Sequence, residues 1–419
     1  MVKKLFSNSM IYVISLLFNK GLTFLLLPVL TYYLSKEDYG VLGLVTAIST
    51  IASIYVGFFP SNFLLARFAQ YGKEKIAEYM HHILLLTIAT TSLVLLILIG
   101  FQHILLPEHL ENKTILMIVI TLYAMFSIFF RFIDTILQVE QHAIKFAVLQ
   151  TFQSLGSLGL GLILIIEFSY GWKGKYYAEL LILFFIFVYS IYYIVKNQYY
   201  KYNTDYKKLK ELFVFLFPLT FSVLGLYLMG TIDRIFISNM LGLEAAGIYN
   251  VAITMAIIIN MVYDAISKAL NPILYEHLAR NERENKIKIV KLIYLYSIVC
   301  IVIFILFVFF LPYIFHLMIN GKFEEALVLI PVLALGFTFE GLRKVLEAPL
   351  VFKHKVKSLA AITLLAGLIN IVLNYLLINL FGIEGAAYAT LISFLVLYII
   401  SLLLVFKEIK LPWLLTKKK

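Results

Sequence analysis

The chain is dominated by a succession of long apolar stretches that are separated by short polar connections. A helix that crosses the hydrocarbon core of a bilayer needs ~20 mostly apolar residues, because its backbone polar groups must be hydrogen-bonded within the helix. The stretches that meet this length are twelve in number: 9–33, 41–66, 82–106, 114–137, 146–170, 176–195, 212–238, 246–272, 291–318, 326–350, 358–380 and 385–406. The sequence therefore predicts an all-α polytopic membrane protein with twelve transmembrane helices.

Composition excludes the main alternatives to a membrane protein. Charged residues make up 14% of the 419 residues, and the mean hydropathy is +0.94. A soluble domain carries ~25% charged residues, so this chain lacks the charge to cover a water-facing surface. The single cysteine, Cys300, excludes an internal disulfide and a thiolate metal site. The connections are too short for a catalytic domain, and no phosphate-binding loop or zinc motif is present, so we predict no enzyme activity, metal or cofactor.

Lysine and arginine are distributed unequally between the two sets of connections. Twelve crossings place both termini on one side of the membrane, and the connections on that side hold 24 basic residues against five on the other. The excess of positive charge marks the cytoplasmic side, so both termini are predicted to be cytoplasmic. The net charge of +11 is spread over separate loops. It therefore indicates contact with anionic lipids, and nucleic-acid binding is not expected.

Short segments repeat along the chain at a nearly constant offset. The matching residues are Leu34, Glu37 and Gly40 with Leu241, Glu244 and Gly247 at an offset of 207; Arg131 and Asp134 with Glu340 and Arg343 at 209; and Gly171, Gly174 and Ala178 with Gly382, Gly385 and Ala389 at 211. Their common order indicates two halves of six helices each. Because six is even, both halves enter the membrane from the same side, and the repeat is parallel.

This repeat predicts how the chain is organised. We expect an N-terminal bundle over 1–195, a cytoplasmic linker over 196–211, a C-terminal bundle over 212–406 and a basic cytoplasmic tail over 407–419. Two bundles related by an axis along the membrane normal form a transporter architecture. A substrate would bind between them near the midplane, and rocking of the bundles would alternate its access.

Several predicted spans contain acid–base pairs at helical spacing. Each charged residue costs about 2.5–3.5 kcal/mol at the centre of a membrane helix, so such residues are expected to face one another or a polar interior. Asp264 lies four residues before Lys268, and Glu340 lies three residues before Arg343. Two interpretations stay open. In the first, the residues form structural pairs near the cytoplasmic helix ends. In the second, Asp264 and Glu340 bind a coupling Na⁺ or proton.

Other candidate residues lie in the first and seventh spans. Lys20 lies halfway along the first span beside Asn19, with no acidic residue in that helix. It either hydrogen-bonds to a neighbouring helix or lines a cavity for an anionic substrate. Asp233 and Arg234 are adjacent, and their side chains point ~100° apart on a helix, so we expect one of them to face a cavity. Pro28, within the first span, is a candidate hinge.

Two segments carry a family resemblance. Residues 19–40 read Asn-Lys-Gly-Leu-Thr-Phe-Leu-Leu-Leu-Pro-Val-Leu-Thr-Tyr-Tyr-Leu-Ser-Lys-Glu-Asp-Tyr-Gly and resemble the opening of the polysaccharide flippases, the O-antigen and repeat-unit exporters. Residues 233–250 resemble the opening of the second half in that family. The family belongs to the multidrug/oligosaccharidyl-lipid/polysaccharide (MOP) exporter superfamily, which also holds the multidrug and toxin extrusion (MATE) transporters.

The resemblance implies a MATE-like fold and a lipid substrate. Such proteins turn an undecaprenyl-diphosphate-linked oligosaccharide over from the inner to the outer leaflet of the bacterial cytoplasmic membrane, for surface polysaccharide biosynthesis. The resemblance also implies that Lys20 and Arg234 contact the diphosphate. The expected partners are this substrate, membrane lipids and other polysaccharide assembly proteins, and the protein is expected to be a monomer. The alternative is a cation-coupled drug or metabolite antiporter of the same fold.

The predicted topology can be tested by labelling. Cysteines introduced at Asn112 and Lys322 should react with an impermeant thiol reagent added outside intact cells, because both connections are predicted to be external. A cysteine at Asn203 should react only after the membrane is permeabilised. Labelling of the Asn203 site from outside would contradict the orientation that the basic residues predict.

Overall fold

The computed structural model describes residues 24–58, 60–280, 282–409 and 411–413, together with 11–12, 15, 18–19 and 21–22. These residues form helices and connections, and no strand occurs among them. The elements are α2 (Leu27–Tyr33), α3 (Lys36–Tyr55), α4 (Pro60–Gly100), α5 (Gln102–Leu105), α6 (Lys113–Val139), α7 (Ala143–Ile166), α8 (Gly171–Lys196), α9 (Tyr206–Met240), α10 (Leu243–Arg280), α11 (Arg283–Met318), the 3₁₀ helix η1 (Gly321–Phe323), α12 (Ala326–Phe352) and α13 (Val356–Glu408).

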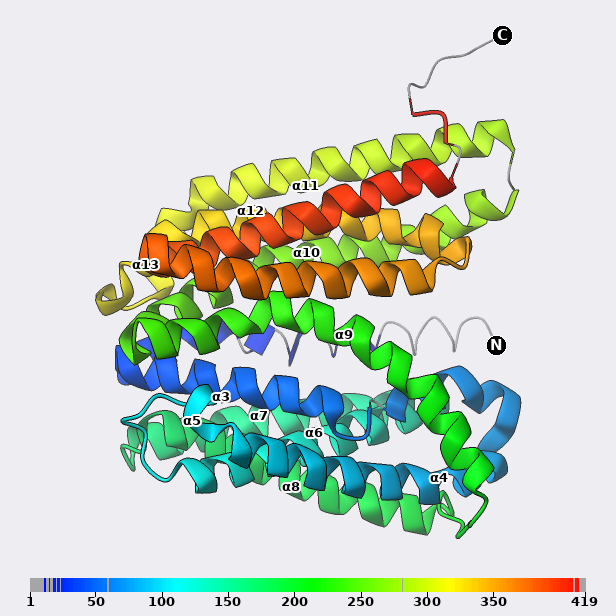
Figure 1. Cartoon of the computed structure of the whole chain (residues 1–419), viewed down its shortest axis with the longest axis horizontal. Helices are drawn as coiled ribbons and strands as arrows, with labels where there is room; N and C mark the ends of the chain where they lie inside the picture. Colours follow the sequence, from blue (N-terminus) through cyan, green and yellow to red (C-terminus); the bar gives the residue numbers. More distant parts are fainter. Residues whose placement is uncertain are drawn as a thin grey trace. The chain divides into compact units, whose positions relative to one another are not determined.

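The helices have the lengths and apolar character that membrane spans require. Among the described residues, nine helices are long and apolar enough to cross a bilayer, and α9, which bends by 42°, makes a tenth. The 53-residue α13 contains two spans, because its backbone leaves the helical conformation at Gly382. Figure 1 shows its two arms, in orange and red, running side by side in opposite directions. The predicted all-α polytopic fold is confirmed.

One predicted span is broken in the structure. The stretch 41–66 was expected to be a single helix, but α3 ends at Tyr55 and α4 begins at Pro60. Gly57 has a φ of 64°, a conformation that ends a right-handed helix, and Pro60 has no N–H to donate to the preceding turn. Hydropathy alone does not reveal this break, because the residues on both sides of it are apolar.

The connections between helices follow local chemistry. Ser35 caps α3: its hydroxyl accepts a hydrogen bond from the backbone N–H of Asp38, and the Asp38 carboxylate accepts one from the backbone N–H of Ser35. Gly171 and Gly382, which are equivalent in the sequence repeat, both have positive φ, 53° and 59°. Both mark a reversal between helices, where the left-handed backbone favours glycine.

Apolar side chains cover the outside of the helices as well as their interior. Along α11, Ile298, Ile305 and Phe309 are each about 60% exposed. A water-soluble protein does not expose such a continuous apolar surface, whereas hydrocarbon solvates it. This face of α11 is therefore the surface expected of a helix that contacts lipid.

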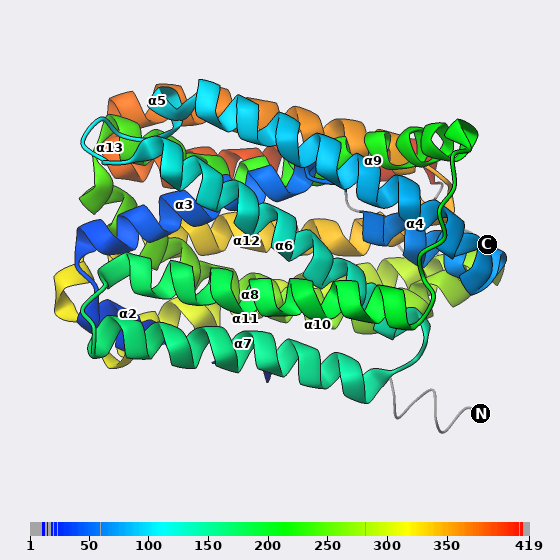
Figure 2. The ribbon, with the colours of Figure 1, turned by 90° about the horizontal axis from the view of Figure 1, so that it is seen from below.

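The chain divides into two compact units. The first contains Met1–Thr220 and Gly242–Gly247, and the second contains Phe221–Leu241 and Ile248–Lys419. In the first unit, α6 packs on α3, α4 and α8, and α7 lies along α8 (Figure 2). In the second unit, α12 packs on α11 and α13. The division into bundles of 1–195 and 212–406 stays a prediction.

The linker 196–211 is anchored to α4 within the first unit. Lys201 and Lys208 both donate hydrogen bonds to the carboxylate of Glu78, and Lys201 also donates its backbone N–H to the carbonyl of Ala77. At the end of the linker, Glu211 accepts hydrogen bonds from Tyr71 (2.8 Å) and Tyr79 (2.5 Å). The hydrogen bond from Lys208, followed by that from Lys201, lowers the pKa of Glu78 below its ordinary value of 4.5.

This anchoring predicts a pH-dependent linker. Because the pKa of Glu78 is lowered, its stabilising effect is complete above pH 4.5 and is lost as the pH falls through the lowered value. Glu78→Gln should increase hydrogen exchange over 196–211 at pH 7, whereas the wild type should reach similar exchange only in acid, after correction for the intrinsic rate. Glu74→Gln, at an exposed position on the same helix, is the matched control. Equal protection in the Glu78 and Glu74 variants would contradict this anchoring.

Candidate functional site

The second unit carries a buried carboxylate on α9. Asp233 is completely buried, and its Oδ2 accepts a hydrogen bond from the Tyr249 hydroxyl of α10 at 2.5 Å. The hydroxyl of Thr390, on the second arm of α13, lies 3.5 Å from the same oxygen. The backbone N–H of Arg234 donates to Oδ1 at 2.9 Å. Asp233 therefore joins three helices of this unit through neutral donors.

The neighbouring Arg234 side chain has different partners. Its Nε donates to Asn250 Oδ1 of α10 at 3.0 Å, and one terminal nitrogen donates to the carbonyl of Gly230 at 3.1 Å. The other terminal nitrogen makes no hydrogen bond within the part of the chain that the structure describes. Arg234 is only partly buried. Its guanidinium is thus held in place by neutral oxygens and keeps a donor for a further ligand.

A second group of polar side chains lies between the two arms of α13. Asn370 donates to Ser393 Oγ at 3.1 Å, and Asn374 donates to Asn370 Oδ1 at 3.0 Å. Both asparagines are completely buried, and Asn374 Oδ1 accepts no hydrogen bond from a described residue. Ser393 lies one turn after Thr390 on the second arm. The interior of this unit therefore contains buried polar side chains in addition to Asp233.

The candidate ion-coupling residue Asp264 lies between two lysines. Lys344 of α12 approaches its Oδ1 at 3.1 Å and also donates to Asn260 Oδ1 at 2.8 Å. Lys268, one turn further along α10, donates to the other carboxylate oxygen at 2.8 Å. Lys344 is nearly buried, whereas Lys268 is exposed. The sequence spacing revealed the pair within α10 but not the contact with α12.

The other candidate, Glu340, is paired within its own helix. Both oxygens of Glu340 accept hydrogen bonds from the Arg343 guanidinium, at 2.7 and 2.8 Å, and Arg343 also donates to Glu347 at 2.5 Å. Glu340 and Arg343 are both buried. Such a bidentate pair offsets much of the cost of placing these charges inside the unit.

The remaining predicted residues lie near the N-terminus. Lys20 lies outside the described residues. Asn19 is buried, and its amide donates to the backbone carbonyl of Ser15 at 2.7 Å. Pro28 is the second residue of α2, which begins just after a turn at Leu26. This break fits a proline that cannot continue the preceding helix, and its action as a hinge stays a prediction.

The structure adds residues that pattern analysis missed. Tyr249, Asn250 and Thr390 become neighbours of Asp233 and Arg234 only through helix packing, since they lie at least 15 positions away in the sequence. Glu179 of α8, within a predicted span, was also missed. It accepts a hydrogen bond from Tyr123 of α6 at 2.7 Å and pairs with Lys175 at 3.4 Å. Its position four residues after Lys175 was the available signal.

The described part of the chain offers no cluster of three or more His, Cys, Asp or Glu side chains that could hold a metal ion. The site instead combines one arginine with neutral oxygens and separate acid–base pairs. An arginine that keeps an N–H donor for a further ligand suits the binding of an anion.

Comparison with known families identifies the chain. A family model described as "Polysaccharide biosynthesis protein" matches residues 5–278, well over half of the chain, and one described as "MatE" matches residues 218–376. The chain therefore belongs to the polysaccharide biosynthesis protein family, and the predicted membership of the MOP superfamily is confirmed.

Two curated proteins match the chain at low sequence identity. An "uncharacterized membrane protein" of Haemophilus influenzae is 24% identical over 65% of this chain and 66% of its own length. The "Lsg locus putative protein 1" of the same organism is 24% identical over 67% of this chain and 68% of its own. The first alignment thus spans slightly less than two thirds of the relative.

Solved structures show the same fold. An inward-facing multidrug resistance MATE family transporter of the MOP superfamily superposes with a TM-score of 0.72 at 14% identity, covering 96% of both chains. The lipid II flippase MurJ superposes with a TM-score of 0.73 at 14% identity, covering 96% of this chain and 87% of its own. At such low identity the likeness defines the fold, and the MATE-like fold that was predicted is confirmed.

Proposed function

We propose that the chain is a flippase that moves an undecaprenyl-diphosphate-linked oligosaccharide from the inner to the outer leaflet of the bacterial cytoplasmic membrane by alternating access. The polysaccharide biosynthesis family supports a role in making a surface polysaccharide. The fold shared with a lipid II flippase supports a lipid-linked substrate. In this proposal the protein is a monomer with cytoplasmic termini, and it works beside other polysaccharide assembly proteins.

The arrangement of the Arg234 guanidinium is the observation that best supports this proposal. A diphosphate carries about two negative charges and is costly to bring into an apolar surrounding without cations. Among the described residues, the Arg234 side chain donates to the neutral oxygens of Asn250 and Gly230, so its guanidinium forms no salt bridge with a carboxylate. Its fork of N–H donors suits phosphate oxygens. Lys20 is the proposed second cation, and Asn19 and Asp233 are the proposed flanking residues.

Substitution of the two cations tests the anion site. Lys20→Ala and Arg234→Ala should each abolish export, while the protein reaches the membrane in normal amounts. Lys20→Arg should keep part of the activity, because the charge remains. Surface glycan and accumulated lipid-linked intermediates are measured in a deletion strain that carries each variant. Loss of glycan with accumulation of the intermediate is the expected result.

Two matched controls remove a basic residue elsewhere. Arg280→Ala removes an exposed arginine that pairs with Glu276, and Lys173→Ala removes an exposed lysine. Both variants should export normally. Normal glycan display by the Lys20 and Arg234 variants would contradict the anion site and leave these residues a role in helix packing.

The coupling ion is the second part of the proposal. We place it at Asp264, with Glu340 as a further candidate, and infer that a proton or Na⁺ competes with Lys344 for the Asp264 carboxylate. Lys344 already shares its donors between Asp264 and Asn260, so it can stay hydrogen-bonded when the carboxylate is taken by an ion. The exchange would change the link between α10 and α12.

Asp264→Asn tests this exchange. The variant should still bind lipid-linked substrate, but its export in vesicles should no longer depend on the Na⁺ or proton gradient, because the amide does not bind these ions as a carboxylate does. Glu276→Gln, which breaks an exposed i,i+4 pair on the same helix, is the control and should keep the dependence. Unchanged ion dependence in Asp264→Asn would make the carboxylate purely structural.

A cation-coupled drug or metabolite antiporter is the second candidate function. The MatE match over residues 218–376 and the MATE-like fold favour it. The two functions predict different phenotypes for a deletion strain. A flippase deletion lowers surface glycan and accumulates lipid-linked intermediates, whereas an antiporter deletion raises drug sensitivity and leaves the glycan unchanged.

A further inference from the structure

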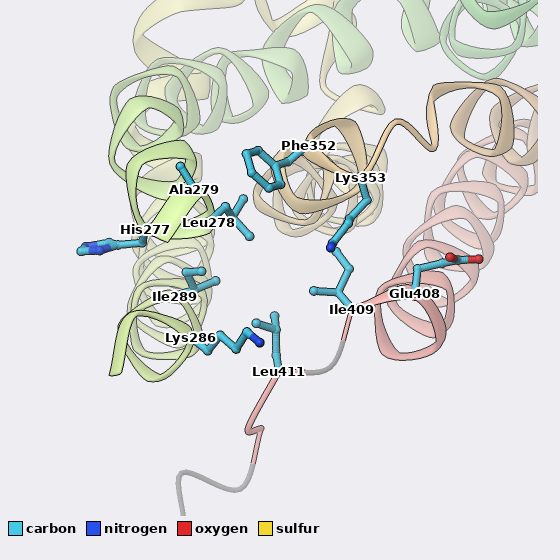
Figure 3. Close-up of a pocket in the computed structure, with 10 residues that line it drawn as sticks. All are labelled: His277, Leu278, Ala279, Lys286, Ile289, Phe352, Lys353, Glu408, Ile409 and Leu411. Atoms are coloured by element: carbon cyan, nitrogen blue, oxygen red, sulfur yellow. The ribbon is translucent and has the colours of Figure 1, made fainter. Parts of the chain in front are cut away.

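A cavity of about 550 Å³ lies within the second unit, at the ends of four helices that the basic residues place on the cytoplasmic side. Its walls come from the last turns of α10 and α12, the start of α11, the end of α13 at Glu408, and Ile409 and Leu411 just after it (Figure 3). This volume is in the range of small-ligand pockets, 300–1,000 Å³. The anion and ion-coupling sites proposed above do not use these residues.

Two lysines point into the cavity. Figure 3 shows the amino groups of Lys286, on α11, and Lys353, just after α12, directed toward its centre from opposite walls. Neither lysine forms an ion pair with a described residue. Three basic neighbours instead form pairs with acidic side chains: Arg280 with Glu276, Lys288 with Glu284 and Lys355 with Glu408. Lys286 and Lys353 thus bring to the cavity two positive charges without an acidic partner among the described residues.

The other polar residues of the wall do not cancel this charge. Glu408 points away from the cavity in Figure 3, and its carboxylate accepts a hydrogen bond from Lys355 at 2.7 Å. His277 also points away, and its Nδ1 lies 2.8 Å from Asn285 Oδ1. The interior of the cavity is therefore positive, and its ligand should be an anion.

The rest of the wall is apolar. Leu278, Ile289 and Leu411 are buried, and Phe352 is partly buried beside them. A small inorganic anion would leave Phe352 and the exposed Ala279 open to water, whereas an acyl chain or glycerol backbone would cover them. The combination of two inward ammonium groups with an apolar wall fits an amphiphile with an anionic head group.

We propose that this cavity binds the phosphate head group of an anionic phospholipid from the cytoplasmic leaflet. Lys286 and Lys353 contact the phosphate from opposite sides, and the acyl end lies along Ala279 and Phe352. Anionic lipids are concentrated in that leaflet, and basic pockets between helices on this side suit their head groups. This site is independent of the transported substrate.

The lipid would also stabilise the residues that follow α13, up to Trp413. Ile409 and Leu411 form part of the cavity wall. Just beyond them, the backbone carbonyl of Trp413 accepts a hydrogen bond from the Tyr294 hydroxyl at 2.7 Å, and its ring packs on Phe406 with centroids 4.7 Å apart. A ligand that fills the cavity would contact Ile409 and Leu411, so binding should raise the thermal stability of the protein.

Binding is tested with the purified full-length protein by native mass spectrometry and thermal unfolding. Phosphatidylglycerol should form adducts and raise the unfolding temperature, and phosphatidylcholine should do so less. The Lys286→Ala, Lys353→Ala double variant should bind phosphatidylglycerol about 30-fold more weakly, since each basic residue near an anionic lipid contributes about a factor of five. Lys288→Ala, two residues from Lys286 and directed to Glu284, is the matched control and should bind normally.

Further measurements distinguish a lipid phosphate from free inorganic phosphate and exclude a folding defect. The Lys286→Arg, Lys353→Arg variant should keep most of the binding, and the alanine variant without lipid should unfold at the wild-type temperature. Equal phosphatidylglycerol binding by the alanine variant and the wild type would overturn the proposal. Lysine-dependent binding of inorganic phosphate at the same affinity would overturn the assignment to a lipid.

Discussion

The need to satisfy every backbone polar group inside hydrocarbon governs this structure. In a chain whose spans are helices, it keeps the backbone helical across the membrane, so the chain can change direction only where a residue tolerates a non-helical backbone. Gly171 and Gly382 provide such positions at equivalent places in the two halves of the sequence, each with a positive φ. The same constraint explains the buried hydroxyls of Ser49 and Thr87, which return hydrogen bonds to carbonyls one turn earlier in their own helices.

Charged side chains within the second unit must also be compensated by neighbouring groups. Arg343 lies between Glu340 and Glu347, and Lys344 bridges Asp264 and Asn260, so these charges are compensated by near neighbours. Removing one member of such a pair leaves the other uncompensated, which costs more than the pair itself contributes. An ion that binds the Asp264 carboxylate must therefore displace a lysine from it, because neither carboxylate oxygen is free. That requirement links ion binding to the contact between α10 and α12.

The fold could be predicted from the sequence, because hydropathy over ~20 residues reports directly on membrane crossing. Pairs within one helix were also visible, since the spacing of Glu340 and Arg343 places them on one face. Contacts between helices were not visible. Lys344 meets Asp264 across 80 positions, and Tyr249 meets Asp233 across 16, so only packing brings them together. The break at Gly57 was missed because a single turn of altered backbone leaves hydropathy unchanged.

The adjacency of Asp233 and Arg234 explains how a cation can be kept available inside a membrane protein. An isolated arginine there is costly, and a nearby carboxylate reduces the cost. Tyr249 and the backbone N–H of Arg234 occupy the Asp233 oxygens, so the carboxylate lies close to the guanidinium without a salt bridge between their side chains. The guanidinium is instead oriented by Asn250 and the carbonyl of Gly230, and these neutral oxygens leave it without a salt bridge to any described residue. An anionic ligand can therefore bind Arg234 without first breaking a salt bridge, which distinguishes this residue from Arg343 in the same unit.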